Sequence, residues 1–109
     1  MITVHLFYTG KNGAARRFAE EMTVCGTVAA IRAEAGNLRY EYYQSLDDPE
    51  TVLLIDQLRD QAAIDAHHAS PMMVEIARLR EKYDLHMTVE RFISDEGGLP
   101  DSDRSFIRE

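Results

Sequence analysis

The sequence has a single cysteine, Cys25, and no tryptophan among its 109 residues. One cysteine excludes an intrachain disulfide and any metal motif built on paired cysteines. No basic run is longer than Arg16-Arg17, and the formal net charge is -7. This balance argues against nucleic-acid phosphates or anionic membrane surfaces as the main binding partners. No apolar run approaches the roughly 20 residues that a membrane-spanning helix needs.

The first residues also lack the pattern of a secretory signal. Met1-Ile2-Thr3-Val4-His5 has no charged segment followed by an apolar core and a cleavage site. Together with the lone cysteine, this predicts a cytoplasmic location. The length suits one domain, and a domain of this size buries only about 60–70% of its unfolded surface. We therefore expect the chain to form an oligomer.

The hydrophobic pattern predicts the element order β-α-β-β-α-β. Apolar and β-branched runs predict strands over residues 2–8, 38–46, 52–58 and 85–93. Helical spacing predicts one helix over residues 14–35 and a second after Asp60 that is interrupted at Ser70-Pro71. This order is typical of ferredoxin-like α+β folds, with a four-stranded antiparallel sheet covered by helices on one face. The predicted domain is 1–93, followed by a C-terminal arm or disordered tail at 94–109.

Details of the helices follow from the same spacing. Asn12 and Asp60 are the expected helix N-caps. Met22 and Cys25 share one apolar stripe, so the thiol is expected to be buried. The expected inner stripe of the last long helix is Met73, Ile76, Ala77 and Arg80. The first and third strands are apolar on both sides, so a second copy of the chain is expected to cover the sheet face without helices.

Histidine is the side chain that titrates near neutrality, and the sequence has four. His67 follows Ala63 by four residues and Ile64 by three, so it is expected to face the sheet. In an apolar pocket it can act as a general base toward an acidic hydroxyl. The same spacing fits a core histidine bonded to a backbone carbonyl, and the sequence leaves both readings open. His68 lies at the edge of the same face.

Other chemistry has less support. His5 and His86 are expected on neighbouring strands, but no ligand spacing accompanies them, and no metal site is predicted. Gly10-Lys11-Asn12-Gly13 has neither dinucleotide nor Walker spacing, so no nucleotide or flavin site is predicted. The tyrosines of the second strand either line a site for a flat aromatic ligand or pack the sheet; they are Tyr40, Tyr42 and Tyr43.

Two stretches carry a family resemblance. One is the run Ala33-Glu34-Ala35-Gly36-Asn37-Leu38-Arg39-Tyr40-Glu41, followed by Ser45-Leu46-Asp47-Asp48-Pro49. The other is Ala63-Ile64-Asp65-Ala66-His67, followed by Ser70-Pro71. Their order resembles the antibiotic biosynthesis monooxygenase family over about residues 1–93. The resemblance implies a dimeric α+β barrel, in which two sheets pack face to face and each subunit has a pocket between sheet and helices.

The resemblance also implies an activity. Enzymes of the family oxidise electron-rich phenols, hydroquinones or anthrones with O₂, so no cofactor is expected. A base removes a proton from the substrate, and the resulting anion passes one electron to triplet oxygen, which avoids the spin-forbidden direct reaction. The resemblance makes His67 the base, and the candidate lining of the substrate site is His5, Phe7, Tyr40, Leu54, Leu58 and Ile64.

The sequence departs from the family pattern at several positions. Leu58 stands where many members have a tryptophan, and Met72 where many have a histidine after Ser-Pro. Haem-degrading relatives have an asparagine in the first strand, where this chain has His5 and Phe7. They also have a tryptophan at the position of His67 and a histidine at about Ala77. All three residues are missing here, so haem degradation is disfavoured. Three functions stay open: a cofactor-independent oxygenase or quinol oxidase acting on a small aromatic substrate, an isomerase of a small oxygenated metabolite, and a non-catalytic dimer that binds a small molecule.

Overall fold

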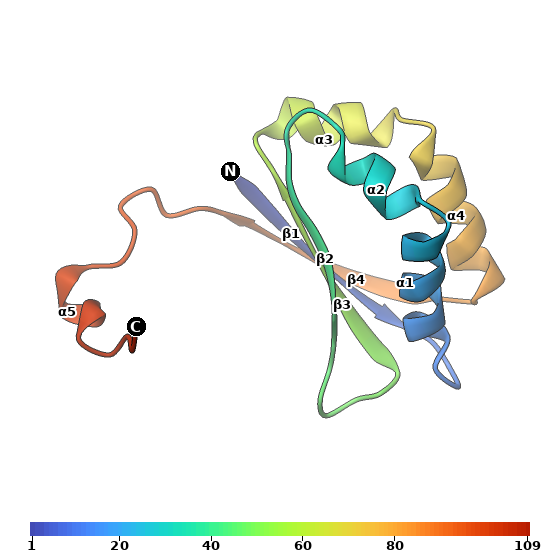
Figure 1. Cartoon of the computed structure of the whole chain (residues 1–109), viewed down its shortest axis with the longest axis horizontal. Helices are drawn as coiled ribbons and strands as arrows, with labels where there is room; N and C mark the ends of the chain where they lie inside the picture. Colours follow the sequence, from blue (N-terminus) through green and yellow to red (C-terminus); the bar gives the residue numbers. More distant parts are fainter.

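A computed structural model describes all 109 residues and contains four strands and five helices. In chain order they are β1 (Ile2–Thr9), α1 (Ala14–Val24), α2 (Thr27–Arg32), β2 (Asn37–Gln44), β3 (Thr51–Leu58), α3 (Gln61–His68), α4 (Met72–Lys82), β4 (His86–Ile93) and α5 (Asp101–Arg104). The strands form one antiparallel sheet in the order β2-β3-β1-β4. Helices α1 to α4 lie over one face of it (Figure 1). The predicted ferredoxin-like fold is confirmed.

The register of the sheet arranges its helix-facing side chains in rows, because paired residues on antiparallel strands share a face. The first row is Tyr40, Asp56, Val4 and Arg91. The second row is Tyr42, Leu54, Leu6 and Val89. The third row is Gln44, Val52, Tyr8 and Met87. These rows run from the α3 end of the sheet toward the α1 end.

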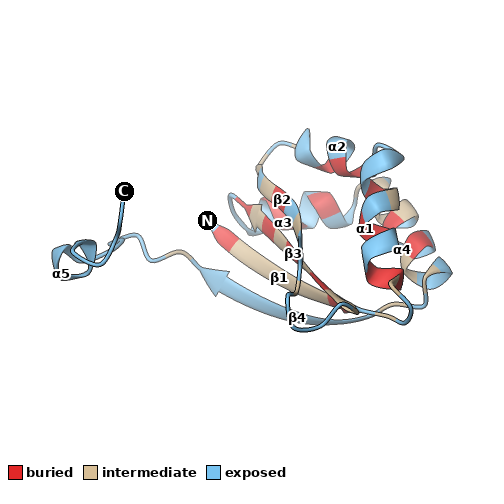
Figure 2. Ribbon diagram, turned by 60° about the horizontal axis from the view of Figure 1, so that its bottom comes forward, coloured by how far each residue is buried: buried red, intermediate tan, exposed pale blue.

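The main hydrophobic core lies where α1 and α4 cover the sheet. Phe18 and Met22 of α1 and Leu79 of α4 are fully buried there. The Phe18 ring packs on the Tyr8 ring, with 5.0 Å between centroids. In Figure 2 the buried residues, drawn in red, lie on the sides of these helices and strands that face each other. Each such side chain contributes about 1.5–3 kcal/mol when it leaves water, so this region holds the helices to the sheet.

The helix predicted over residues 14–35 is two helices, because Gly26 interrupts it. Gly26 adopts φ 89°, a left-handed conformation that glycine tolerates and that commonly ends a helix. The chain turns there, and α2 starts in a new direction. Cys25 consequently leaves the apolar stripe: it is exposed, with its sulfur 3.1 Å from Thr27 Oγ1. The expectation of a buried thiol was wrong.

One of the two predicted helix caps is present, and the inner face of α4 differs in part from the prediction. The Asp60 carboxylate accepts a hydrogen bond from the Ala63 backbone N–H at 2.9 Å, as expected of an N-cap. Asn12 does not cap α1, since Gly13 precedes the helix and no side-chain cap bond forms. On α4, Ile76 is buried as expected, but Ala77 is exposed. The helix is rotated so that Leu79 takes the inner position instead.

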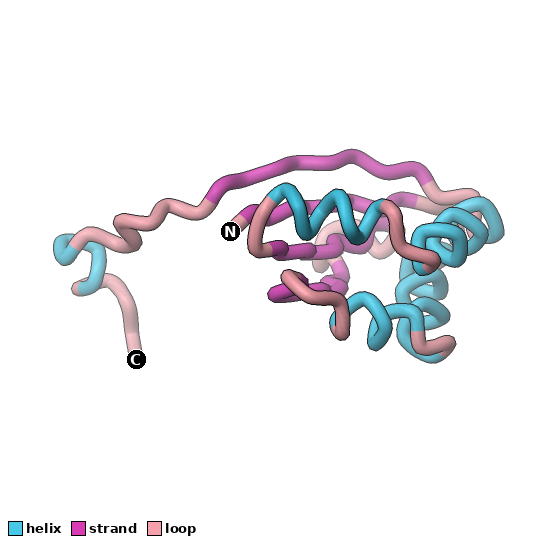
Figure 3. The backbone as a smooth tube through the Cα atoms, turned by 90° about the horizontal axis from the view of Figure 1, so that it is seen from above, coloured by secondary structure: helices cyan, strands magenta, loops and turns pink.

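One sheet edge and the C-terminal residues lie outside the helical layer. β4 is an edge strand, and all eight of its residues are exposed. Figure 3 shows β4 along the outside of the domain, with the chain after it running away from the sheet to α5. None of the helices is long and apolar enough to cross a membrane.

Candidate active site

A cavity of about 320 Å³ lies between the inner face of the sheet and helices α3 and α4. Its walls are mainly aliphatic, with Leu6 and Leu54 of the second row below and Ile64 and Ile76 of the helices above. Six titratable side chains also line it: Tyr40, Asp56, His67, His68, Arg80 and Arg91. A volume of this size suits a small ligand, and a mostly apolar wall with few polar groups is typical of such sites.

His67 occupies the last turn of α3 and is only 7% exposed. Its Nδ1 lies 2.8 Å from a carboxylate oxygen of Glu34, which belongs to the loop between α2 and β2. A carboxylate can only accept a hydrogen bond, so Nδ1 carries the hydrogen and Nε2 is left as the acceptor of the neutral ring. The pair therefore fixes the tautomer that a general base requires.

Asp56 is another titratable group in the cavity wall, and it was not among the site residues predicted from the sequence. It is 7% exposed, and burial raises the pKa of Asp56 to about 6. His67 nearby and the Asn37 amide, 3.3 Å from its carboxylate, lower this pKa, while Glu34 raises it. A signal was present in the sequence: Leu54, Asp56 and Leu58 alternate onto one face of a strand, so the charge had to point inward.

The structure brings together five of the seven site residues expected from the sequence. His67 and Ile64 of α3 meet Tyr40 of β2 and Leu54 and Leu58 of β3 around the cavity. Burial raises the pKa of Tyr40 above its ordinary value, so this phenol stays neutral and serves as wall and hydrogen-bonding group.

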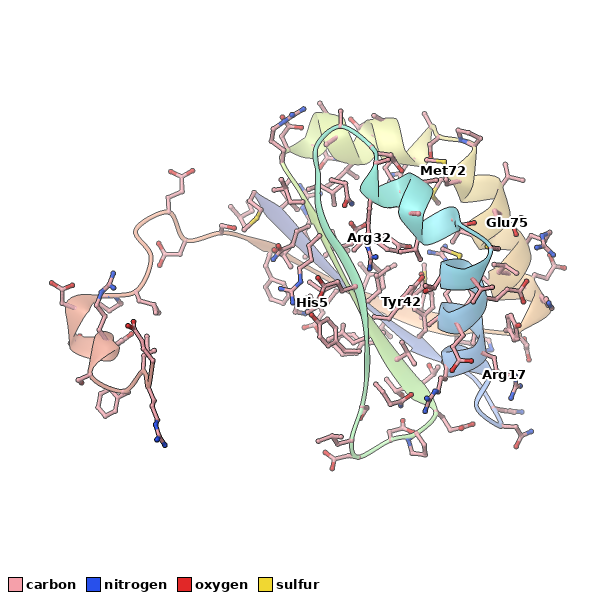
Figure 4. The ribbon with its side chains drawn as sticks, in the orientation of Figure 1. His5, Arg17, Arg32, Tyr42, Met72 and Glu75 are labelled. Carbon is pink, nitrogen blue, oxygen red and sulfur yellow. The ribbon has the colours of Figure 1, made fainter.

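His5 and Phe7 do not reach the cavity, which corrects their expected place in its lining. Strand residues alternate between faces, and in β1 Val4 and Leu6 are the ones that face the helices. The His5 ring packs instead against Phe92 on the open face, 4.9 Å between centroids. In Figure 4, His5 lies on the side of the sheet away from the helices, whereas Tyr42 and Arg32 lie on the helical side.

The remaining histidines form no site with His5. His5 pairs with Glu90 and His86 pairs with Thr9, so the two histidines are four residues apart along neighbouring strands. No three histidine, cysteine, aspartate or glutamate side chains come together as metal ligands. His68 is exposed at the cavity rim, with its ring 5.9 Å from that of His67.

A second hollow, of about 470 Å³, lies between α1 and β2 and is open to solvent. Arg16 and Glu20 form part of its wall, but they pair with each other at 3.0 Å and are exposed. No histidine or aspartate lines this hollow. The cavity at His67 is therefore the one equipped for proton transfer.

The profile of the antibiotic biosynthesis monooxygenase family matches residues 1–79. The chain belongs to this family. The family includes cofactor-independent monooxygenases as well as members of unknown function. No curated protein is significantly similar to the chain.

Solved structures show the same fold. PA3566 from Pseudomonas aeruginosa is 28% identical, with 85% of this chain and 92% of that one covered and a TM-score of 0.72. A candidate antibiotic biosynthesis monooxygenase from Deinococcus radiodurans is 18% identical, with coverages of 88% and 94% and a TM-score of 0.75. A variant of SnoaB, a cofactor-independent oxygenase from Streptomyces nogalater, is also 18% identical, with coverages of 87% and 93% and a TM-score of 0.71.

Proposed function

We propose that this protein is a cofactor-independent monooxygenase or quinol oxidase, which uses O₂ to oxidise a small aromatic substrate with an acidic hydroxyl. The observation that carries the proposal is His67: a buried imidazole in an apolar cavity, with Nδ1 held by Glu34 at 2.8 Å. Family membership and the description of SnoaB as a cofactor-independent oxygenase support the same chemistry.

The first step of the proposed reaction is proton transfer. The substrate hydroxyl donates its proton to Nε2 of His67, and the Glu34 carboxylate stabilises the imidazolium that forms. Positioned acid–base groups of this kind contribute about 10²–10⁴-fold to a rate. The aliphatic wall excludes water, so the substrate anion is a stronger electron donor than in solution.

Oxygen reacts in the second step. The substrate anion gives one electron to O₂, and the substrate radical and superoxide then combine into a peroxide. In an anthrone the O–O bond breaks with loss of water, so one oxygen atom stays in the quinone and the other leaves as water. In a hydroquinone, two electrons and two protons pass to O₂, giving quinone and hydrogen peroxide. Asp56, protonated below about pH 6, is a second group able to return a proton.

Oxygen uptake by the purified protein with hydroquinones or anthrones under air tests this function. We expect uptake that depends on the protein and falls about 10²–10⁴-fold in His67→Ala. His86→Ala is the matched control, because His86 is an exposed strand residue outside the cavity. An absence of protein-dependent uptake, or equal uptake by His67→Ala, would refute the proposal.

A second candidate is isomerisation of a small oxygenated metabolite. The presence of Asp56 and His67 in one cavity favours it, because a proton taken by one group can be returned by the other at a different carbon. Turnover without oxygen separates the two reactions: an isomerase keeps its rate under anaerobic conditions, whereas an oxygenase stops. If the protein binds a ligand but turns it over neither with nor without oxygen, the remaining hypothesis is a non-catalytic dimer that binds a small molecule.

We also propose that the protein is a homodimer joined through the sheet face without helices. This face carries Phe7, Tyr43, Leu53, Ile55 and Phe92, and Tyr43 and Phe92 are 37% and 45% exposed. Apolar strand residues of this kind gain from a second sheet packed against them. Sedimentation of the wild type as a dimer and of Ile55→Lys as a folded monomer is expected, and a monomeric wild type would refute this assembly.

A further inference from the structure

Arg80 is a cavity residue with an unused hydrogen-bond donor. Its Nη2 donates to the Tyr8 hydroxyl at 2.8 Å, and its guanidinium carbon lies 5.4 Å from the centre of the Tyr8 ring. Its Nε is buried and has no hydrogen-bond partner. A buried donor without an acceptor is unfavourable, and Arg80 lines the cavity, so its guanidinium gains when a ligand supplies an acceptor.

Arg80 also has no acidic partner, although the chain carries 19 aspartates and glutamates. By contrast, Arg78, two residues earlier on α4, forms ion pairs with Glu75 and Glu21 on the outer surface. Arg91, at the β4 side of the cavity, is exposed and also forms no ion pair. The cavity therefore holds two arginines, and neither forms a salt bridge with Asp56, the carboxylate in its wall.

Arg80 lies next to a different row of the sheet from His67, the proposed base. Arg80 contacts Tyr8 in the third row, whereas Asp56 belongs to the first row and His67 lies near it. The two rows are four residues apart along β1, which is about 13 Å at the rise of a strand. Leu6 and Leu54 fill the row between them. His67 and Arg80 thus belong to different parts of the same cavity, which leaves room for a separate anionic group beside Arg80.

We propose that the substrate carries a permanent oxyanion, a carboxylate or a phosphate, that the Arg80 guanidinium binds at the end of the cavity opposite His67. The aromatic ring lies over the aliphatic middle row, and the hydroxyl reaches the base. The placement of the hydroxyl rests on the function proposed above, but the preference of Arg80 for an anion does not. A planar guanidinium suits both carboxylate and phosphate oxygens.

Calorimetry with matched probes tests the anion site without requiring turnover. The probes are p-hydroxyphenylpropionate, its neutral amide and phenyl phosphate. We expect at least one of the two anions to bind about tenfold or more tightly than the amide, the factor that a charge-assisted hydrogen bond supplies. Arg80→Met should abolish this difference. Arg78→Met, which makes the same change of charge on the outer face of the same helix, should preserve it.

Arg80→Lys keeps the positive charge but lacks the planar guanidinium, so it covers the case in which Arg80→Met fails to fold. It should reduce the preference for the anion several-fold. Stronger binding of the carboxylate identifies a carboxylate substrate, and stronger binding of phenyl phosphate identifies a phosphorylated one. Equal binding of anion and amide, an unchanged preference in Arg80→Met or Arg80→Lys, or no binding of either anion at millimolar concentration would overturn the proposal.

The two proposals fail separately. An Arg80-dependent preference for anions with no oxygen uptake on any phenol would keep the anion site and remove the oxygenase. Oxygen uptake that depends on His67 but is the same for neutral and anionic substrates, and the same in Arg80→Met, would keep the oxygenase and remove the anion site.

Discussion

The inner face of the sheet supports two regions of different character. Under α1 and the C-terminal half of α4, Tyr8, Phe18 and Leu79 are fully buried in the main core. Under α3 the same strands border a cavity of about 320 Å³ and place Asp56 and His67 beside it. The buried carboxylate of Asp56 and the buried imidazole of His67 both border this cavity. One part of the sheet therefore carries the main core, and the neighbouring part carries the cavity.

The largest effect is expected in the packed region. Phe18→Ala removes a fully buried ring and should lower the free energy of unfolding by about 3–5 kcal/mol. Val89→Ala, at the 54% exposed rim of the cavity, is the control and should cost far less. Urea denaturation measures both. Similar losses in the two variants would contradict the division into a packed and an open region.

In contrast to Phe18→Ala, Asp56→Asn should raise the free energy of unfolding at neutral and alkaline pH. Since burial raises the pKa of Asp56 from 3.8 to about 6, the native state holds its proton more tightly than the unfolded state. The resulting stabilisation is complete below about pH 4 and is lost as the pH rises through about 6. Above that pH the buried carboxylate is ionised near His67, Glu34 and the Asn37 amide.

Asp56→Asn cannot ionise, so at pH 8 it should be more stable than the wild type by up to about 3 kcal/mol, and the difference should vanish near pH 4. Denaturation at a series of pH values measures it. Asp65→Asn, on the exposed side of α3, is the control and should show no such trend. A constant difference at every pH would show that Asp56 does not titrate in this range.

Glu34→Gln tests the base rather than the packing. The amide can accept from Nδ1, but it carries no charge to stabilise the imidazolium. A hydrogen bond to a charged group is worth about 1.5–3 kcal/mol, so oxygen uptake should fall by about 10- to 100-fold. The fall should appear in kcat more than in KM, because the imidazolium forms only during reaction. Unchanged kcat would remove Glu34 from the proposed mechanism.

The smallest effect is expected at the start of α3. Asp60→Ala removes the cap on the Ala63 N–H and should lower the stability slightly, by less than any of the changes above. Asp60→Ser retains a capping oxygen and should recover most of it. Thermal unfolding measures both, and equal stability of the two variants would contradict the capping role.

Much of this architecture could be predicted from local pattern. Alternation and helical spacing predicted the strands, and the Asp60 cap and the inward side of α3 followed from spacing alone. Local reasoning failed where neighbours in sequence take different directions. Gly26 turns the chain and exposes Cys25, and alternation along β1 turns His5 and Phe7 away from the face that Val4 and Leu6 share.

By itself the sequence determined the order of elements, the family and the inward direction of His67, because these depend on the spacing of apolar residues and on short motifs. Only the tertiary structure decided what surrounds that imidazole. Glu34 is 33 residues away in the chain, and the Arg80 partner Tyr8 is 72 residues from it. Such contacts depend on the packing of helices on a particular sheet register, which no local spacing encodes. The charge balance of the cavity is a property of the folded chain.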